Sequence, residues 1–176
     1  MKRNTDIFVL VGLMGCGKTR VGIELAKLLT LPFFDADREI EQAAGMPIPD
    51  IFSKLGESEF RRGEKKVLDR LLNGQDKVIA SGGGAFIQDE IRNSIKNNSI
   101  SIWLKADINV LLERVLRSDH RPLLHNVDPE EKMRELMTQR YPIYAEADIT
   151  VDVKDQSPRR MARMIQNEIE TLRKRT

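Results

Sequence analysis

The stretch GLMGCGKT, residues 12–19, matches the pattern G-x-x-x-x-G-K-[ST] at every fixed position. Glycines at Gly12, Gly15 and Gly17 let the backbone turn so that successive amides point inward at a phosphate, and the helix that follows adds its positive N-terminus. In this pattern Lys18 supplies an ammonium to the β- and γ-phosphates of a nucleotide, and Thr19 offers a hydroxyl to Mg²⁺. A glycine-rich turn with an incidental lysine is the alternative.

The flanking sequence favours the phosphate-binding interpretation. Residues 7–11, IFVLV, form a continuous apolar run rich in β-branched side chains, typical of a strand buried on both faces. After the loop, apolar residues recur at helical spacing up to residue 30. Strand, loop and helix in this order are the context that the motif requires. Cys16, inside the loop, is interpreted as a small packing residue rather than a redox or catalytic group.

The rest of the chain alternates strand and helix patterns. Further strands are predicted at residues 33–35, 77–80, 99–104 and 149–153. Helices are predicted from residue 36 to about 73, with interruptions at 45–49 and at Gly56, after Asp107, from Pro129 and from Pro158. This order predicts an α/β fold with one parallel sheet covered by helices on both faces. Residues 47–73 and 118–126 fit the alternation poorly, and we expect them over the carboxyl ends of the strands, where ligands bind.

Length and composition narrow the class of protein. A chain of 176 residues suits one domain, and 29 Lys and Arg against 27 Asp and Glu leave too little basic excess for nucleic acid binding. The longest apolar run has five residues, whereas roughly 20 span a bilayer, and residues 1–6 leave no room for a targeting segment. A single cysteine suits a reducing compartment. We expect a cytoplasmic monomer without membrane or nucleic acid partners.

Asp35-Ala36-Asp37 follows the second predicted strand. In an extended segment, side chains two residues apart point to the same side, so both carboxylates would face the phosphate loop. One would then hold Mg²⁺ through water, and the other would accept a proton from, or orient, an acceptor hydroxyl. Helix capping by Asp37 is an equally good interpretation, and the motif alone does not decide between them.

The arginines and glycines of the chain indicate which kind of molecule accepts the phosphate. Arg61, Arg121 and Arg140 are candidates for binding a carboxylate or phosphate through two parallel hydrogen bonds, although any one of them alone is more typical of solvated surface. Gly82, Gly83 and Gly84 follow the third strand and would let a ligand lie against the backbone, whereas an ordinary turn rarely needs three glycines. The prediction is phosphoryl transfer from Mg·ATP to a hydroxyl of a small anionic metabolite.

Six segments together resemble the shikimate kinase family, which is related to the nucleoside monophosphate kinases. They are GLMGCGKTRVG (12–22), FFDADREIE (33–41), DIFSKLGESEFRRGE (50–64), SGGGA (81–85), RPLL (121–124) and QRYPIYAEAD (139–148). The resemblance covers nearly the whole chain. It implies a three-layer P-loop kinase fold with a five-stranded parallel sheet in the order 2-3-1-4-5, within a single domain. It also implies a shikimate-binding subdomain at about residues 35–64 and a lid at about residues 116–127.

The resemblance also implies roles on the acceptor side. Asp37 would bind the shikimate hydroxyls and act as candidate base. Arg61 and Arg140 would hold the shikimate carboxylate, with Glu64 orienting Arg61. Gly82, Gly83 and Gly84 would contact the ring hydroxyls. Phe52 and Phe60 would form an apolar wall under the ring, although core packing explains both almost as well.

On the nucleotide side, the resemblance implies that Lys18 and the loop residues Gly12, Gly15, Cys16 and Gly17 bind phosphate, while Thr19 and Asp35 serve Mg²⁺. Arg121 would close with the lid onto the transferring phosphate. Arg114 would stack on adenine, and Pro158 would border that base.

The implied reaction transfers the γ-phosphate of ATP to the 3-hydroxyl of shikimate, in chorismate and aromatic amino acid biosynthesis. The rival hypotheses are a small kinase acting on gluconate or a nucleoside monophosphate, and a catalytically silent relative that binds ATP or a partner.

Overall fold

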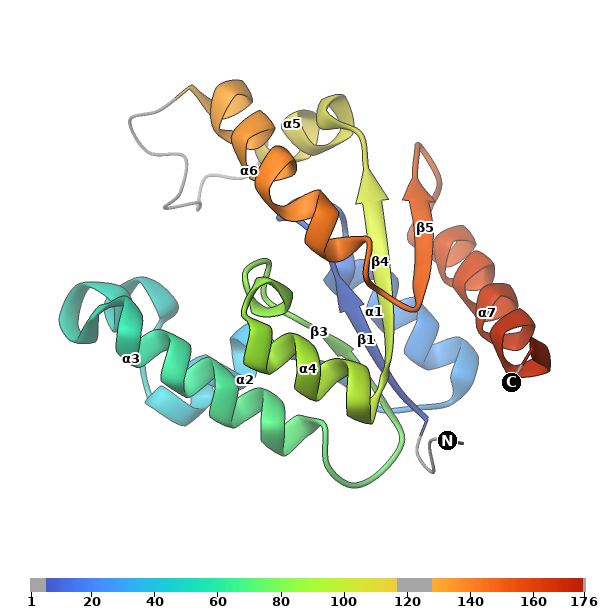
Figure 1. Ribbon diagram of the computed structural model, residues 1–176, viewed down its shortest axis with the longest axis horizontal. Helices are drawn as coiled ribbons and strands as arrows, with labels where there is room; N and C mark the ends of the chain where they lie inside the picture. The colour runs from blue at the N-terminus through green and yellow to red at the C-terminus, as the bar shows by residue number, and fades with distance from the viewer. Residues whose placement is uncertain (1–5, 117–127, 176) are drawn as a thin grey trace.

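The computed structural model describes residues 6–116 and 128–175, and Figure 1 shows their arrangement. Five parallel strands form one sheet in the order β2-β3-β1-β4-β5, which is the predicted order. The strands are β1 (Ile7–Val11), β2 (Phe33–Asp35), β3 (Lys77–Ala80), β4 (Ile100–Ala106) and β5 (Ile149–Val153). The helices of the described ranges are α1 (Lys18–Leu29), α2 (Ala36–Ala44), α3 (Ile48–Leu71), the 3₁₀ helix η1 (Ala85–Ile87), α4 (Asp89–Asn98), α5 (Ile108–Leu116), α6 (Pro129–Tyr144) and α7 (Pro158–Arg175).

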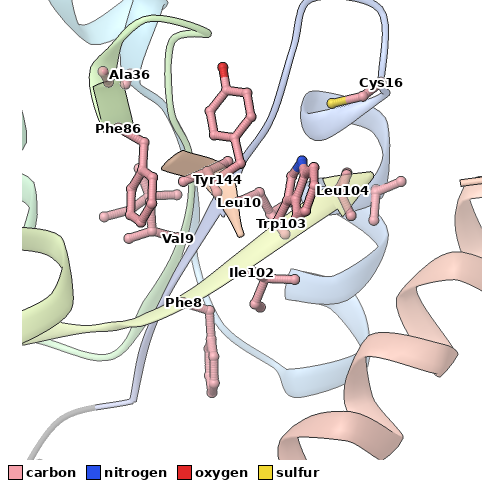
Figure 2. Packing of buried hydrophobic residues seen from close by; sticks show 14 of the residues in the cluster. Phe8, Val9, Leu10, Cys16, Ala36, Phe86, Ile102, Trp103, Leu104 and Tyr144 are labelled. Atoms are coloured by element: carbon pink, nitrogen blue, oxygen red, sulfur yellow. The ribbon is translucent and has the colours of Figure 1, made fainter. Parts of the chain in front are cut away.

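Helices cover both faces of the sheet. α1 and α7 pack on each other on one side, while α3, α4 and α6 lie on the other (Figure 1). β1 is the central strand, and each of its residues is at most 1% exposed. Figure 2 shows buried side chains around β1 and β4: Phe8, Leu10 and Ile102 belong to this core, and the ring of Trp103 lies 6.0 Å from that of Tyr144. In the part of the chain that the structure describes, no helix has the length and apolar character to cross a membrane.

The strand order indicates where a ligand would bind. The chain runs from β1 to β2 and β3 on one side, then returns to β4 on the other side of β1. A topological switch point therefore lies at the carboxyl end of β1, where ligands bind in open α/β sheets. The glycine-rich loop follows β1 there, and Gly82 to Gly84 follow the neighbouring strand β3. The fold alone brings the two glycine segments to one edge.

Most predicted elements are confirmed within a few residues, and one region was missed. η1 and α4, between β3 and β4, were not predicted. α4 buries Ile91 and Ile95, which are four residues apart and so face the same side of the helix. The glycines at residues 82–84 favour a loop before η1, and the apolar pattern of α4 is weak because it buries only these two residues. The interruptions at residues 45–49 and at Gly56 are confirmed as the gap before α3 and a kink within it.

Replacing either of two glycines of α3 by alanine is expected to change the stability of the protein, in opposite directions at the two positions. Gly63 lies in regular helix, and the place that a Cβ atom would occupy is open, so Gly63→Ala is expected to raise the free energy of unfolding by about 0.5–1 kcal/mol. Gly56 also has open space, but its φ of 85° and ψ of 168° form a conformation that is essentially restricted to glycine.

Gly56→Ala is therefore the matched control, with an expected loss of about 1–3 kcal/mol. Urea unfolding of both variants measures the difference. Equal effects of the two substitutions would show that backbone conformation does not distinguish these positions.

Candidate active site

The loop between β1 and α1 bends at glycines whose φ angles are positive: 140° at Gly12, 82° at Gly15 and 100° at Gly17. Gly17 is the N-cap residue of α1, so the backbone amides of the loop lie next to the N-terminus of this helix. Cys16 is 1% exposed and belongs to the buried core (Figure 2), in line with its interpretation as a packing residue.

Lys18, the first residue of α1, reaches back over this loop. Its Nζ donates to the carbonyl oxygen of Gly12 at 2.7 Å and to that of Leu13 at 3.1 Å. Nζ also lies 3.8 Å from Cys16 Sγ. The ammonium is thus held beside the loop amides, where it adds positive charge to an anion-binding site.

Thr19 and Asp35 form the second polar pair of the site. Thr19 Oγ1 donates to Asp35 Oδ2 at 2.8 Å, although the residues are 16 apart in sequence. A hydroxyl and a carboxylate are hard oxygen ligands of the kind that Mg²⁺ takes together with phosphate oxygens and water. This donor set next to a phosphate loop fits Mg²⁺ bound with a nucleotide.

The structure corrects the prediction for Asp37 in two respects. α2 begins at Ala36, and its N-cap residue is Asp35, whose Oδ1 accepts from Asp37 N at 3.1 Å. The capping interpretation of Asp37 is therefore wrong. The extended-segment argument is wrong as well, because Asp37 lies in the first turn of α2. Asp35 ends a strand and Asp37 starts a helix, so the two carboxylates have different surroundings.

Those surroundings change the acidity of Asp37. The pKa of Asp37 is raised from 3.8 to about 6, mainly by desolvation in the surrounding protein and then by the negative charge of Asp35. Glu64 and Glu41 add to this shift, while Lys18 opposes it. Asp37 nevertheless keeps contact with solvent. A carboxylate with a pKa near neutrality suits a general base.

Gly82 lies between two carboxylates. A Cβ atom on Gly82 would be 2.9 Å from Asp37 Oδ1 and 3.0 Å from Glu64 Oε1. A Cβ atom on Gly84 would be 2.9 Å from Arg61 Nη1. None of the three glycines has a positive φ, and a Cβ atom on Gly83 would make only ordinary contacts, at 3.7 Å or more. Gly82 and Gly84 therefore provide space, because a side chain at either position would displace Asp37, Glu64 or Arg61.

Two arginines flank the same segment. Arg140 Nη1 donates to the carbonyl oxygen of Gly83 at 3.3 Å, and Arg61 lies against Gly84. Arg61 also pairs with Glu64, at 2.9 Å from Nη1 to Oε2, and with Glu57 at 3.3 Å. Two guanidinium groups and the Asp37 carboxylate therefore surround one glycine segment. This arrangement favours a ligand that carries both an anionic group and a hydroxyl.

Aromatic rings border the Arg61 side of the site. The Arg61 guanidinium lies 5.2 Å from the ring centroid of Phe60, and the rings of Phe60 and Phe52 are 4.6 Å apart. Phe60 is buried, whereas Phe52 is 39% exposed. Core packing therefore accounts for Phe60 but leaves Phe52 free to contact a ligand.

A hollow of about 390 Å³ lies beside Arg61 and is lined by Arg61, Arg62, Lys65, Gln88, Asp89, Glu90 and Ile91. Its lining combines three basic with two acidic side chains, so most of its positive charge is offset.

Two tyrosines of α6 support the site, and sequence reasoning gave them no role. Tyr144 OH donates to the carbonyl oxygen of Gly83, and Tyr141 OH donates to that of Ala106. Burial raises the pKa of Tyr141 to about 12 and that of Tyr144 still further, although Arg140 opposes the shift at Tyr144. Both hydroxyls therefore remain protonated donors. The pattern R-Y-x-x-Y after a helical run was the available signal.

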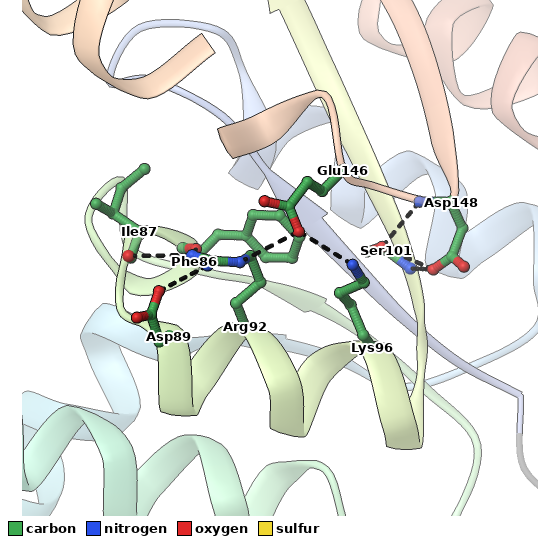
Figure 3. Close-up of polar contacts among 8 residues, drawn as sticks. All are labelled: Phe86, Ile87, Asp89, Arg92, Lys96, Ser101, Glu146 and Asp148. Atoms are coloured by element: carbon green, nitrogen blue, oxygen red, sulfur yellow. Dashed lines mark hydrogen bonds and ion pairs between the residues drawn. The ribbon is translucent and has the colours of Figure 1, made fainter. Parts of the chain in front are cut away.

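Arg92 braces the chain just beyond the glycines (Figure 3). Its Nη1 donates to the carbonyl oxygens of Phe86 and Ile87, each at 3.2 Å, and its Nε lies 3.5 Å from Glu146, which Lys96 also approaches at 3.1 Å. These contacts join η1 and α4 to the segment that follows α6. Sequence analysis did not identify Arg92.

Three predicted nucleotide-side residues remain: Arg114, Pro158 and Arg121. Arg114 Nη1 donates to the carbonyl oxygens of Gly15 and Cys16, at 3.4 Å and 3.3 Å, which places Arg114 at the phosphate loop. Pro158 opens α7, and its contact with a base stays a prediction. Arg121 and residues 117–127 of the predicted lid lie outside the described residues.

Comparisons with known proteins agree on one family. A family model described as shikimate kinase matches residues 14–170. A shikimate kinase of Rhodopseudomonas palustris is 52% identical over 147 residues, which are 84% of this chain and 72% of the relative. A shikimate kinase of Bartonella quintana is 49% identical over 167 residues, covering 93% of this chain and 80% of the relative.

Solved structures give the same result. A shikimate kinase from Acinetobacter baumannii in complex with shikimate has a TM-score of 0.91 and 39% identity, covering 96% of this chain and 95% of that one. A gluconokinase from Sinorhizobium meliloti, at 19% identity and a TM-score of 0.56, shares the fold alone.

Proposed function

The chain belongs to the shikimate kinase family, and from this premise we propose that its site transfers the γ-phosphate of ATP to the 3-hydroxyl of shikimate. The products are ADP and shikimate 3-phosphate, an intermediate on the way to chorismate and the aromatic amino acids.

One observation carries this assignment beyond the family relationship. Around Gly82 to Gly84, the guanidinium groups of Arg61 and Arg140 lie beside the Asp37 carboxylate. Arginine binds a carboxylate through two parallel hydrogen bonds, and the nearby carboxylate accepts from hydroxyl groups. Shikimate carries both kinds of group on one ring. The glycines leave room for that ring to lie against the backbone.

The acceptor side supplies orientation and a proton acceptor. Arg61 and Arg140 hold the substrate carboxylate, and the backbone of Gly82 to Gly84 contacts the ring hydroxyls. Asp37 takes the proton as the 3-oxygen forms its bond to the γ-phosphorus. The bond between that phosphorus and the β–γ bridging oxygen breaks, and ADP leaves. Phosphoryl transfer asks mainly for such positioning and for charge neutralisation.

The nucleotide side supplies charge neutralisation. The loop amides from Gly12 to Gly17 and the Lys18 ammonium hold the phosphates. Thr19 and Asp35 would hold Mg²⁺, which when bound offsets the negative charge of the β- and γ-phosphates. We assign Arg114 and Pro158 to the adenine, and Arg121 to the transferring phosphate.

We also propose the division of the chain into a substrate-binding part at about residues 35–64 and a lid at about residues 116–127. A lid over the site would exclude water, which otherwise competes with the acceptor hydroxyl.

The rate is expected to depend on the ionisation of Asp37. Because the pKa of Asp37 is raised from 3.8 to about 6, the carboxylate form predominates only above that pH. As pH falls below about 6, kcat/KM for shikimate should fall tenfold per unit, because this constant reports ionisations of the enzyme before shikimate binds. Rates at saturating ATP from about pH 5 to about pH 8 measure this limb. An acid limb with a midpoint near the ordinary pKa of aspartate would contradict the assignment of Asp37 as base.

The test of the proposed function is ADP release by the purified protein with Mg·ATP, measured without acceptor and then with shikimate, gluconate or a nucleoside monophosphate. Strong stimulation by shikimate alone is the expected result. Stimulation by gluconate or by the nucleotide instead would overturn the choice of acceptor. A protein that binds ATP and shikimate yet never releases ADP in response would instead be a catalytically silent relative.

We propose that the enzyme works as a monomer in the cytoplasm, where ATP is abundant. The groups assigned above all come from a single chain, so the reaction does not need a second subunit. Light scattering after gel filtration, with activity measured across the peak, tests the monomer.

A further inference from the structure

We propose that Gln88 is a positioning residue for the substrate carboxylate, acting through Glu64 on Arg61. This inference rests on the proposed function and adds a residue to it. Gln88 does not belong to any of the motifs that identify the site. It lies between η1 and α4, in the segment that follows the three glycines.

The contacts form a chain of three side chains. Gln88 Nε2 donates to Glu64 Oε2 at 2.7 Å, and Arg61 Nη1 donates to the same oxygen at 2.9 Å. Glu64 is 1% exposed, so its carboxylate depends on these donors for the hydrogen bonds that water would otherwise provide. Its other oxygen, Oε1, faces Gly82. Gln88 thus fixes the direction in which Glu64 presents Oε2.

Arg61 contacts two carboxylates, one on each side of its guanidinium group. The inner partner is Glu64, and the outer partner is Glu57, which lies 3.3 Å from Arg61 Nη2 and whose side chain is 68% exposed. An arginine drawn outward to Glu57 would leave the face of Gly84 against which it now lies. By holding Glu64 in place, Gln88 favours the inward position, in which the guanidinium points at the substrate.

The backbone of Gln88 gives this side chain a rigid base. Gln88 N donates to the carbonyl oxygen of Ala85 at 3.2 Å, and Gln88 O accepts from Arg92 N at 2.8 Å. The residue is therefore fixed to the segment that follows Gly84, while Glu64 and Arg61 belong to α3. The hydrogen bond between Gln88 and Glu64 links the two walls of the substrate site.

Gln88→Met tests the inference, because methionine keeps the length of the side chain and removes its donor. We expect KM for shikimate to rise about fivefold to tenfold, with kcat and KM for ATP within about twofold of wild type, since a hydrogen bond to a buried charge is lost. Gln139→Met is the matched control. Gln139 also donates to a glutamate, Glu135, at 3.1 Å, but on the exposed face of α6.

A double-mutant cycle separates positioning from a general effect on folding. If Gln88 acts through Glu64, then Gln88→Met should change KM for shikimate by less than twofold in a Glu64→Gln background. A full fivefold effect in that background would overturn the inference. So would an unchanged KM in the single variant. Should Gln88→Met fold poorly, Gln88→Asn, which shortens the side chain by one methylene, is expected to raise the same KM.

The wild-type assay keeps the two proposals distinguishable. Absence of shikimate-dependent ADP release from the wild type would overturn the proposed function. An active wild type with an unchanged Gln88→Met variant would overturn only the role of Gln88.

Discussion

Asp37→Asn is expected to lower kcat for shikimate phosphorylation by roughly 100- to 10,000-fold, the range for losing a general base. The amide keeps the size of the side chain but cannot take the proton of the 3-hydroxyl. KM for ATP should change little, because Asp37 lies on the acceptor side of the loop. Initial rates of ADP release at saturating ATP and shikimate give kcat directly. A variant that keeps a tenth or more of the wild-type kcat would show that Asp37 orients the hydroxyl without acting as base.

Loss of activity in Asp37→Asn should not come from loss of folding. Because the folded protein raises the pKa of Asp37 from 3.8 to about 6, folding favours the protonated form. That contribution to stability is fully present below about pH 4 and is lost as pH rises through about 6. At pH 7.5 the ionised carboxylate opposes folding, so the neutral amide should leave the protein at least as stable as wild type. Asp152→Asn, on the exposed side of β5, is the matched control for both rate and stability.

Lys18→Met is expected to lower kcat by roughly a thousandfold, because the γ-phosphate then loses the ammonium that neutralises its developing charge. Methionine has a similar length and no charge. Lys27→Met is the control on the same helix, since Lys27 is 67% exposed and pairs only with Glu24 among the described residues. If Lys18→Met and Lys27→Met retain similar kcat values, Lys18 has no role in the transfer.

Nucleotide binding can be followed separately from the chemistry. Trp103, the single tryptophan of the chain, lies beside the loop, with its Cδ1 3.5 Å from the place of a Cβ atom on Gly12. Its fluorescence should respond when ATP binds. With Lys18→Met, we expect the ATP titration to remain measurable while ADP release is lost, which assigns Lys18 mainly to the transfer step.

The layout of the fold was predictable because its signals are local. A buried apolar run before GLMGCGKT defines β1 and the start of α1, and the alternation of strands and helices predicts a parallel sheet. Pro129 and Pro158 mark the first residues of α6 and α7. The family resemblance supplied the strand order. η1 was missed because the glycine run before it favours a loop, and α4 was missed because only two of its residues, Ile91 and Ile95, are apolar and buried.

The site was only partly predictable, since its geometry depends on contacts between distant segments. Sequence spacing predicted that Asp35 and Asp37 lie on the same side of one extended segment, yet Asp35 binds Thr19 and caps α2, while Asp37 lies within α2 and faces Gly82. Nothing in the spacing pairs Gln88 with Glu64, which are 24 residues apart, or Tyr144 with Gly83, which are 61 apart.

By itself the sequence determined the fold class and the phosphate loop, because short motifs and hydrophobic periodicity encode these features locally, while the family resemblance supplied candidates for the side chains of the crevice. Only the tertiary structure decided which carboxylate caps a helix, why Gly82 and Gly84 must lack side chains, and how Arg61 is held. These features follow from packing between elements far apart in the chain, where the space left by one segment sets the side chains that another can carry.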